Sequence, residues 1–243
     1  MNTQYPEINK KTNIVFFTGA GMSAESGIPT YRGSGGIWHK YNWEEYACQD
    51  AFNIDPQKVV NFHNIRREKV AACVPNSGHV TIADLQNKFE NITIITQNID
   101  GLHQLAGSKD IPELHGSLWW GRCKKCNFNI NLRNNFNEIK KCSKCSRWLR
   151  PNITWFGDAL DVAVFQKAHN AILNSEVFIS IGTSGIVHPA AEFPYLAKSN
   201  GAYCIEVNLE TTRLSSIYDS TQIGSAGKIL KELHHTFFDR FIK

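Results

Sequence analysis

Four short stretches of the chain are mostly apolar, and each ends abruptly in small or polar residues. They cover residues 14–17, 92–95, 177–181 and 203–207 and are rich in Ile, Val and Phe. Apolar runs of this length are typical of strands that are buried on both faces, as in a parallel sheet. We therefore predict parallel strands at these four positions.

Between these runs, apolar residues recur at three- and four-residue spacing, which predicts amphipathic helices. One helix is expected to begin near Asp55-Pro56, and others are expected over residues 77–89 and 161–174. A terminal helix capped by Ser225 is expected to bury one apolar stripe made of Ile229, Leu233, Phe237 and Phe241. The alternation of strand and helix predicts an α/β fold with a doubly wound, Rossmann-like parallel sheet.

The composition narrows the class of protein. A length of 243 residues with 42% hydrophobic residues allows one sizeable core and a small inserted module. No apolar run approaches the roughly 20 residues that cross a bilayer, and the first residues lack the apolar centre of a signal peptide. The net charge of +4 is too mild to indicate nucleic acid. We expect a soluble cytoplasmic protein with neither a membrane nor a specific nucleic acid as partner.

The cysteine pattern is the clearest spacing signal in the chain. Two Cys-x2-Cys pairs, Cys123 with Cys126 and Cys142 with Cys145, are separated by 15 residues. This spacing brings four thiolates within reach of one Zn²⁺, and a complete set of sulfur ligands leaves no position for water. The prediction is one structural zinc ion, and a catalytic zinc or two disulfides are less favoured. The remaining Cys48, Cys73 and Cys204 are interpreted as small hydrophobic residues.

A glycine-rich turn follows the first apolar run. Gly19, Gly21 and Ala24 fit the Gly-x-Gly-x-x-Gly/Ala pattern, in which small residues permit a tight turn and the approach of a pyrophosphate. Gly-rich turns after strands are common, so a plain structural turn is an equally good interpretation of this motif alone. The next segment carries Tyr31 and Arg32 among glycines, which predicts a mobile loop over the bound ligand.

Polar residues also follow the other predicted strands, where an open α/β sheet keeps its ligand site. Asn98 and Asp100 alternate after the second strand, although an Asx-type turn is an equal alternative. Thr183 and Ser184 follow the third strand and are suited to phosphate and ribose contacts, while Asn208 follows the fourth. These positions predict one ligand site that several strand ends share.

Five motifs in this chain resemble those of the sirtuin family of NAD-dependent protein deacylases, in the family's order. They are GAGMSAESGIPTYRG from residue 19, TQNIDGLH from 96, LHG from 114, RPNITWFGD from 150 and GTSGIVHP from 182. Tyr31 stands where the family usually has Phe, and Thr154 and Asp158 replace Val and Glu. The resemblance extends from about residue 13 to residue 230, and it implies the sirtuin fold and chemistry.

The resemblance implies NAD as co-substrate, with His115, Asn98 and Asp100 as the catalytic residues and His115 as the general base. From the residues alone, a single His is more often structural, and the imidazole meets the requirement of a base near neutral pH. The implied cofactor contacts are Gly19, Ala20, Gly21, Ser23, Ala24, Tyr31, Arg32, Trp38, Gln97, Asn98, Ile99, Asp100, Gly182, Thr183, Ser184, Asn208, Leu209, Glu210 and Ala226.

The acyl specificity rests on the helix after Asp55, where His63 and Arg66 lie three residues apart on one side. From spacing alone, a solvated basic face is the favoured interpretation. A subset of sirtuins that remove acidic acyl groups carries Tyr-x-x-Arg here, preceded by a small Ala that Ala47 matches. The implied substrate contacts are Ala47, His63, Arg66, Phe156, Gly157 and Val187. An Arg grips a carboxylate through two hydrogen bonds, while a His adds one donor and carries a charge only below a pKa of about 6.5.

The resemblance therefore implies removal of acetyl, and also succinyl or malonyl, groups from protein lysines, with nicotinamide and O-acyl-ADP-ribose as products. The alternatives are an acetyl-specific deacetylase, a mono-ADP-ribosyltransferase or a non-catalytic reader. We expect a monomer with a single catalytic domain over residues 1–243. Its large lobe is expected at 10–38, 77–118 and 150–243, its small lobe at 39–76 and the zinc module at 119–149.

Overall fold

The computed structural model describes residues 5–31 and 36–239. Its centre is a five-stranded parallel sheet with the strand order β2-β1-β6-β7-β8. The strands are β1 (Ile14–Thr18), β2 (Ile92–Thr96), β6 (Val177–Ile181), β7 (Tyr203–Asn208) and β8 (Ser220–Ile223). The four strands predicted from the apolar runs are confirmed, and the short polar strand β8 adds an edge that the pattern did not indicate.

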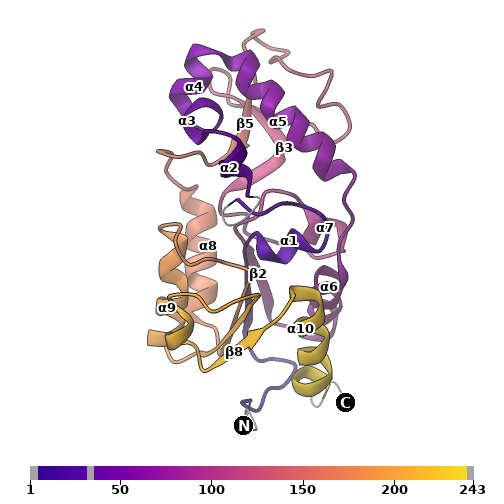
Figure 1. The fold of residues 1–243 in the computed structure, drawn as a ribbon, viewed down its shortest axis with the longest axis vertical. Helices are drawn as coiled ribbons and strands as arrows, with labels where there is room; N and C mark the ends of the chain where they lie inside the picture. Colours follow the sequence, from indigo (N-terminus) through magenta and orange to yellow (C-terminus); the bar gives the residue numbers. More distant parts are fainter. Residues whose placement is uncertain (1–4, 32–35, 240–243) are drawn as a thin grey trace.

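Helices cover both faces of this sheet (Figure 1). One face is covered by α6 (Ser77–Lys88) and α10 (Ala226–Leu233), and the other by α8 (Val162–Leu173) and α9 (Phe193–Ser199). Along β1, Ile14 and Phe16 pack toward α6 and α10, whereas Val15 and Phe17 pack toward α8 and α9. Every residue of β1 is buried because successive side chains point to opposite covered faces. The predicted doubly wound α/β sheet is confirmed.

A second, antiparallel sheet with the order β4-β3-β5 lies at the far end of the molecule, beside three helices (Figure 1). Its strands are β3 (Gly116–Cys123), β4 (Phe128–Asn131) and β5 (Arg150–Ile153), and the helices are α3 (Trp43–Tyr46), α4 (Gln49–Ile54) and α5 (Pro56–Ala71). A core that includes Val59, Leu118 and Trp155 joins α5 to this sheet. The four cysteines form a separate small cluster with Leu149.

The remaining elements are short. They are α1 (Gly21–Ala24), α2 (Ile37–Lys40), α7 (Leu102–Leu105), the 3-10 turns η1 (Ala190–Glu192) and η2 (Ser215–Ile217), and the π-helical turn η3 (His234–Phe238). In the parts of the chain that the structure describes, no helix is long and apolar enough to span a bilayer.

The helix starts show which capping predictions were right. The Asp55 side chain accepts a hydrogen bond from the Lys58 amide, so the start of α5 is confirmed. At α10, by contrast, Ser225 makes no capping bond with its side chain, and Glu25 Oε2 accepts from the Gly227 amide instead. Ser225 is the N-cap residue as predicted, but a carboxylate 200 residues earlier in the chain supplies the side-chain acceptor, and local spacing cannot reveal such a partner. The predicted apolar stripe of this helix is buried at Ile229, Leu233 and Phe237, whereas Phe241 lies outside the described residues.

Candidate active site

A cleft of about 1320 Å³ opens between the carboxyl edge of the parallel sheet and the lobe built on α5 and β5. It lies over β1 and β6, where the strand order reverses, which is the usual ligand position in a doubly wound sheet. Most of the site residues expected from the sequence line it, namely Gly19, Ala20, Gly21, Ala24, Tyr31, Trp38, Ala47, His63, Arg66, Gln97, Asn98, Ile99, His115, Phe156, Gly157, Gly182, Thr183, Ser184, Val187, Asn208, Leu209 and Glu210.

Of the expected cofactor and substrate contacts that the structure describes, three do not line the cleft. Ser23 and Asp100 are buried just behind its wall, and Ala226 is a buried residue at the start of α10. Arg32 lies outside the described residues. The cleft is also lined by residues that the sequence analysis missed, including Thr30, Thr154, Leu160 and Arg213. Of these, Arg213 donates to the Gly185 carbonyl at 2.9 Å.

The glycine-rich turn interlocks with the turn after β6. The Gly21 amide donates to the Gly182 carbonyl at 2.9 Å, and a Cβ atom on Gly21 would lie 2.6 Å from Gly182 Cα. Gly182 itself has a φ of +59°, and a Cβ there would meet the Gly21 backbone at 2.5 Å. Both glycines are therefore required by loop packing in addition to any role they have toward a ligand.

Asn98 and Asp100 converge on one serine, as their alternation predicted. Asn98 Nδ2 donates to the Gly19 carbonyl at 2.9 Å and to Ser23 Oγ at 3.1 Å, and Ser23 Oγ donates to Asp100 Oδ2 at 2.8 Å. The other carboxylate oxygen of Asp100 accepts from the Leu102 amide, so the Asx-type turn is present as well. Burial raises the pKa of the Asp100 carboxyl, against the effect of these hydrogen bonds. Asp100 thus fixes the glycine-rich turn through Ser23 without lining the cleft itself.

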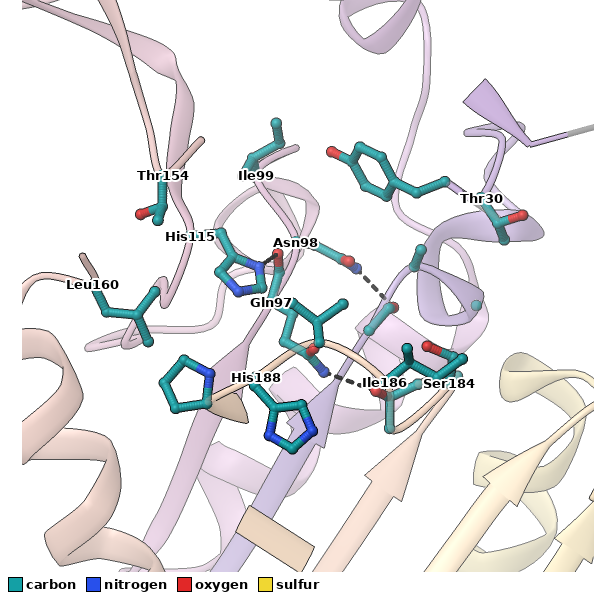
Figure 2. Close-up of a pocket in the computed structure, with 18 of the residues that line it drawn as sticks. Thr30, Gln97, Asn98, Ile99, His115, Thr154, Leu160, Ser184, Ile186 and His188 are labelled. Atoms are coloured by element: carbon teal, nitrogen blue, oxygen red, sulfur yellow. Dashed lines mark hydrogen bonds between the residues drawn. The ribbon is translucent and has the colours of Figure 1, made fainter. Parts of the chain in front are cut away.

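His115 sits at the middle of the cleft with one ring nitrogen engaged (Figure 2). Its Nδ1 lies 3.0 Å from the Gln97 carbonyl oxygen. A carbonyl only accepts hydrogen bonds, so the proton of the neutral ring belongs on Nδ1 and the Nε2 lone pair is free. Burial lowers the pKa of His115 below its ordinary value of 6.5. The ring is therefore neutral at physiological pH, with Nε2 as a proton acceptor.

Amide and hydroxyl side chains continue from His115 toward β6 and β7. Gln97 Nε2 donates to Thr183 Oγ1 at 2.9 Å, and Asn208 Nδ2 donates to the Thr183 carbonyl at 3.0 Å. Figure 2 shows Gln97, Asn98 and Ser184 around the same space as His115. This set of neutral donors and acceptors suits the hydroxyl groups of a nucleotide ribose, so the residues present fit an NAD molecule.

The other side of the cleft is largely aromatic. His63 is 1% exposed and stacks on Trp155, with ring centroids 5.7 Å apart and an interplanar angle of 16°. Burial, together with the charges of Arg66 and Arg67, lowers the pKa of His63 well below 6.5. The charge that His63 could carry below its ordinary pKa of about 6.5 is therefore confined to a pH well below that value. The ring lines the cleft, but it is almost fully buried and is neutral at physiological pH.

Arg66 lines the same part of the cleft and is hydrogen-bonded to Tyr31. Arg66 Nη2 donates to Tyr31 Oη at 2.7 Å, and the guanidinium carbon lies 5.2 Å from the centre of the Tyr31 ring. Ala47, 5% exposed, lies beside Phe156, whose amide donates to the Ala47 carbonyl. The hydroxyl that Tyr31 adds thus has a defined partner, and the solvated basic face favoured by spacing alone does not describe Arg66.

The four cysteines of the zinc pattern lie together at the tip of the small sheet. Their sulfur atoms all lie within 4.8 Å of one another, and Cys123 Sγ and Cys145 Sγ are 3.5 Å apart. Sulfurs bound tetrahedrally at about 2.3 Å from zinc stand about 3.8 Å apart, so the cluster fits one ion. All seven cysteines are free, which removes the disulfide alternative.

The chain was compared with known families, curated proteins and solved structures. The Sir2 family profile matches residues 19–189. The chain is 44% identical over 231 residues to an NAD-dependent protein deacylase of Aquifex aeolicus, covering 94% of this chain and 97% of that protein. It is 42% identical over 222 residues to NAD-dependent protein deacylase 1 of Archaeoglobus fulgidus, covering 90% and 91% of the two chains.

Solved structures agree with these sequence matches. A Sir2 homologue in complex with NAD superimposes with a TM-score of 0.87 at 39% identity, covering 95% of this chain and 91% of the other. A Sir2 complex with a p53 peptide and NAD+ has a TM-score of 0.80 at 30% identity, covering 92% of each chain. The similarity therefore extends over both sheets and the cleft between them.

Proposed function

This chain belongs to the Sir2 family and is an NAD-dependent protein deacylase, and we propose that His115 is its general base. One observation carries this assignment: the bond between His115 Nδ1 and the Gln97 carbonyl leaves Nε2 free inside the cleft. A proton acceptor must lie within hydrogen-bond reach of the group it deprotonates, and only a neutral imidazole accepts. The lowered pKa of His115 keeps it in that state.

The mechanism divides the work between the bound reactants and the protein. When bound, NAD would supply an anomeric carbon at which the oxygen of the acyl-lysine amide displaces nicotinamide, and one water molecule would complete cleavage of the amide C–N bond, so that lysine, nicotinamide and O-acyl-ADP-ribose are the products. His115 Nε2 takes up a proton from a hydroxyl group held in the cleft, and the Gln97 carbonyl stabilises the imidazolium that forms. The protein supplies no nucleophile in this scheme.

The loop after β2 positions the reactants. Asn98 lines the cleft, and because its Nδ2 is bonded to Gly19 and Ser23, its side-chain oxygen is the atom left to accept a hydrogen bond from a bound reactant. Asp100 acts through Ser23 and the Leu102 amide, so we assign it as a positioning residue rather than a direct contact. Gln97, Thr183, Ser184 and Asn208 supply the polar groups for the nucleotide.

We propose that the acyl pocket accepts succinyl or malonyl groups as well as acetyl. Arg66 is the cationic residue at its wall, and a guanidinium binds a carboxylate through paired, charge-assisted hydrogen bonds. Ala47 keeps the pocket wide, and His63 contributes shape without charge. An acidic acyl group would accept the hydrogen bond that Arg66 Nη2 now donates to Tyr31 Oη.

Acyl-lysine segments of proteins are the proposed partners. The cleft continues past His115 to Phe156 and Gly157 on one side and to Val187 on the other, which leaves a slot for an extended peptide backbone. One structural neighbour contains a p53 peptide and NAD+. The four cysteines would hold one structural zinc, and its four thiolate ligands leave no open position for catalysis.

The assignment of His115 is tested by His115→Ala, with the exposed His235→Ala as the matched control. We expect His115→Ala to lower kcat on an acetylated peptide by about 10²–10⁴-fold, the usual contribution of a general base. Calorimetry should show ADP-ribose binding unchanged within about twofold. Full turnover in His115→Ala would contradict the role.

The transferase alternative is separated in the same assay by labelled NAD. Deacylation leaves the label on O-acyl-ADP-ribose, which mass spectrometry detects as a free small molecule. Label that stays covalently attached to the acceptor protein would instead support ADP-ribosyl transfer.

A further inference from the structure

Within the zinc module, the segment between the two cysteine pairs packs against the loop that carries Asn98 and Asp100. The Leu132 amide donates to the Trp119 carbonyl at 2.7 Å. Directly after it, the Arg133 guanidinium lies over the Trp119 ring, 4.3 Å from the ring centre. Trp119 is 3% exposed, so this guanidinium covers an otherwise buried indole.

Trp119 in turn is bonded to the loop after β2, which carries Asn98 and Asp100. Its indole Nε1 donates to the Asp100 carbonyl oxygen at 2.5 Å, and the Asp100 carboxylate accepts from Ser23 Oγ. An unbroken series of contacts therefore connects Arg133 through Trp119 and Asp100 to Ser23, which also accepts from Asn98.

Gly101 shows how closely Arg133 approaches this loop. The residue has a φ of +74°, and a Cβ atom there would lie 2.6 Å from Arg133 Nη2 and 3.0 Å from Trp119 Nε1. The Arg133 side chain thus occupies the space that any other residue at position 101 would need. The loop is enclosed between its own strand β2 and a side chain from the zinc module.

The charge of Arg133 suits this position. Burial raises the pKa of the Asp100 carboxyl, and the positive charges of Arg133 and Arg66 act in the opposite direction. Arg133 is half-buried, and the structure shows no ion pair for it among the described residues. Its guanidinium is therefore engaged with the indole and with the field of the buried carboxylate.

We propose that Arg133 is a positioning residue for the deacylation reaction, which clamps Trp119 onto the turn at Asp100 and Gly101 and so keeps Asn98 in the geometry that binds NAD. The proposal rests on the proposed function of Asn98 and Asp100. It also gives the zinc module a role toward the cofactor, because Arg133 projects from the segment between the two cysteine pairs that would bind the ion.

The test compares Arg133→Met, which keeps the length of the side chain, with Arg147→Met, an exposed arginine of the same module. We expect Arg133→Met to raise KM for NAD about tenfold, with kcat at saturating NAD and KM for the acetylated peptide within about twofold. Hydrogen exchange of the amides at 97–103 should be faster in Arg133→Met. Arg147→Met should match the wild type in all of these, with one zinc per chain in each protein.

Two results would overturn the proposal. One is an unchanged KM for NAD and unchanged exchange at 97–103 in a folded, zinc-containing Arg133→Met protein. The other is an equal rise in KM for NAD in Arg147→Met, which would make the effect one of overall charge. Should Arg133→Met lose zinc or fail to fold, Arg133→Lys decides by the same measurements, because it keeps the charge and loses the planar stacking. A wild-type protein without NAD-dependent turnover would refute the proposed function instead.

Discussion

The two walls of the cleft are built on different principles. The sheet wall, made of residues 19–24, 97–100 and 182–184, is a network in which Asn98, Ser23 and Thr183 each bond to a neighbouring strand end. The lobe wall, made of α5 and residues 153–157, relies on stacked rings, and both ring nitrogens of its buried His63 lack a hydrogen-bond partner of good geometry. Substitutions should therefore be costly on the sheet wall and mild on the lobe wall, where specificity is free to vary.

Exchanging one glycine of the sheet wall should have the largest effect. In Gly182→Ala the new Cβ meets the Gly21 backbone at 2.5 Å, whereas in Gly201→Ala, with a φ of +89°, nothing lies within 4 Å. Both variants should lose about 1–2 kcal/mol of stability, because a residue with a Cβ is strained at positive φ. Gly182→Ala should lose about 1–3 kcal/mol more, because the new Cβ overpacks the contact with Gly21. Urea denaturation and ADP-ribose calorimetry should show a clear loss of stability and of binding for Gly182→Ala only. Equal losses in both variants would refute the interlocked turns.

Arg66→Met should show that the lobe wall controls specificity. Hydrogen bonds to a charged group contribute about 1.5–3 kcal/mol, so the ratio of kcat/KM on succinyl to acetyl peptides should fall about 10- to 100-fold. Activity on acetyl peptide should change little. Lys69→Met, on an exposed position of the same helix, is the control and should leave the ratio as in the wild type. An unaltered ratio in Arg66→Met would remove the acidic-acyl assignment.

The pH dependence should reflect the sheet wall through His115. The neutral ring is the active form, and burial lowers the pKa of His115, so the neutral form persists below pH 6.5. The acidic limb of kcat/KM should therefore lie below pH 6.5, and activity should be lost only as the pH falls through that lowered pKa. The measurement is kcat/KM on acetyl peptide between pH 5 and 8. A midpoint above 6.5 would show that His115 is not the titrating base.

His63→Phe should have the smallest effect. The ring of His63 is neutral and stacked, and its replacement removes two buried nitrogens without a good partner. We expect unchanged acetyl activity within about twofold and a free energy of unfolding equal to or above that of the wild type. Asn98→Leu, the corresponding exchange on the sheet wall, leaves Gly19 and Ser23 without their donor and should cost about 1–3 kcal/mol. Similar losses in both variants would remove the distinction between the walls.

Much of the fold could be predicted from local patterns. Residues 177–181 formed a strand with the predicted bounds because a buried parallel strand needs an apolar run that is visible within five residues. The zinc site was equally predictable, since a site of four thiolates depends on two short Cys-x2-Cys segments. The cap of α10 was not, because Glu25 supplies it from the other end of the chain.

The sequence by itself determined the alternation of strands and helices, the four zinc thiolates and the motifs that carry His115, Asn98 and Asp100. These features depend on spacing within a few residues, where backbone geometry dictates which side chains share a face. Only the tertiary structure decided the tautomer of His115, the neutral state of His63, the bond from Arg66 to Tyr31 and the place of Arg133 over Gly101. Each of these depends on desolvation and on distances between segments far apart in the chain, which no local pattern encodes.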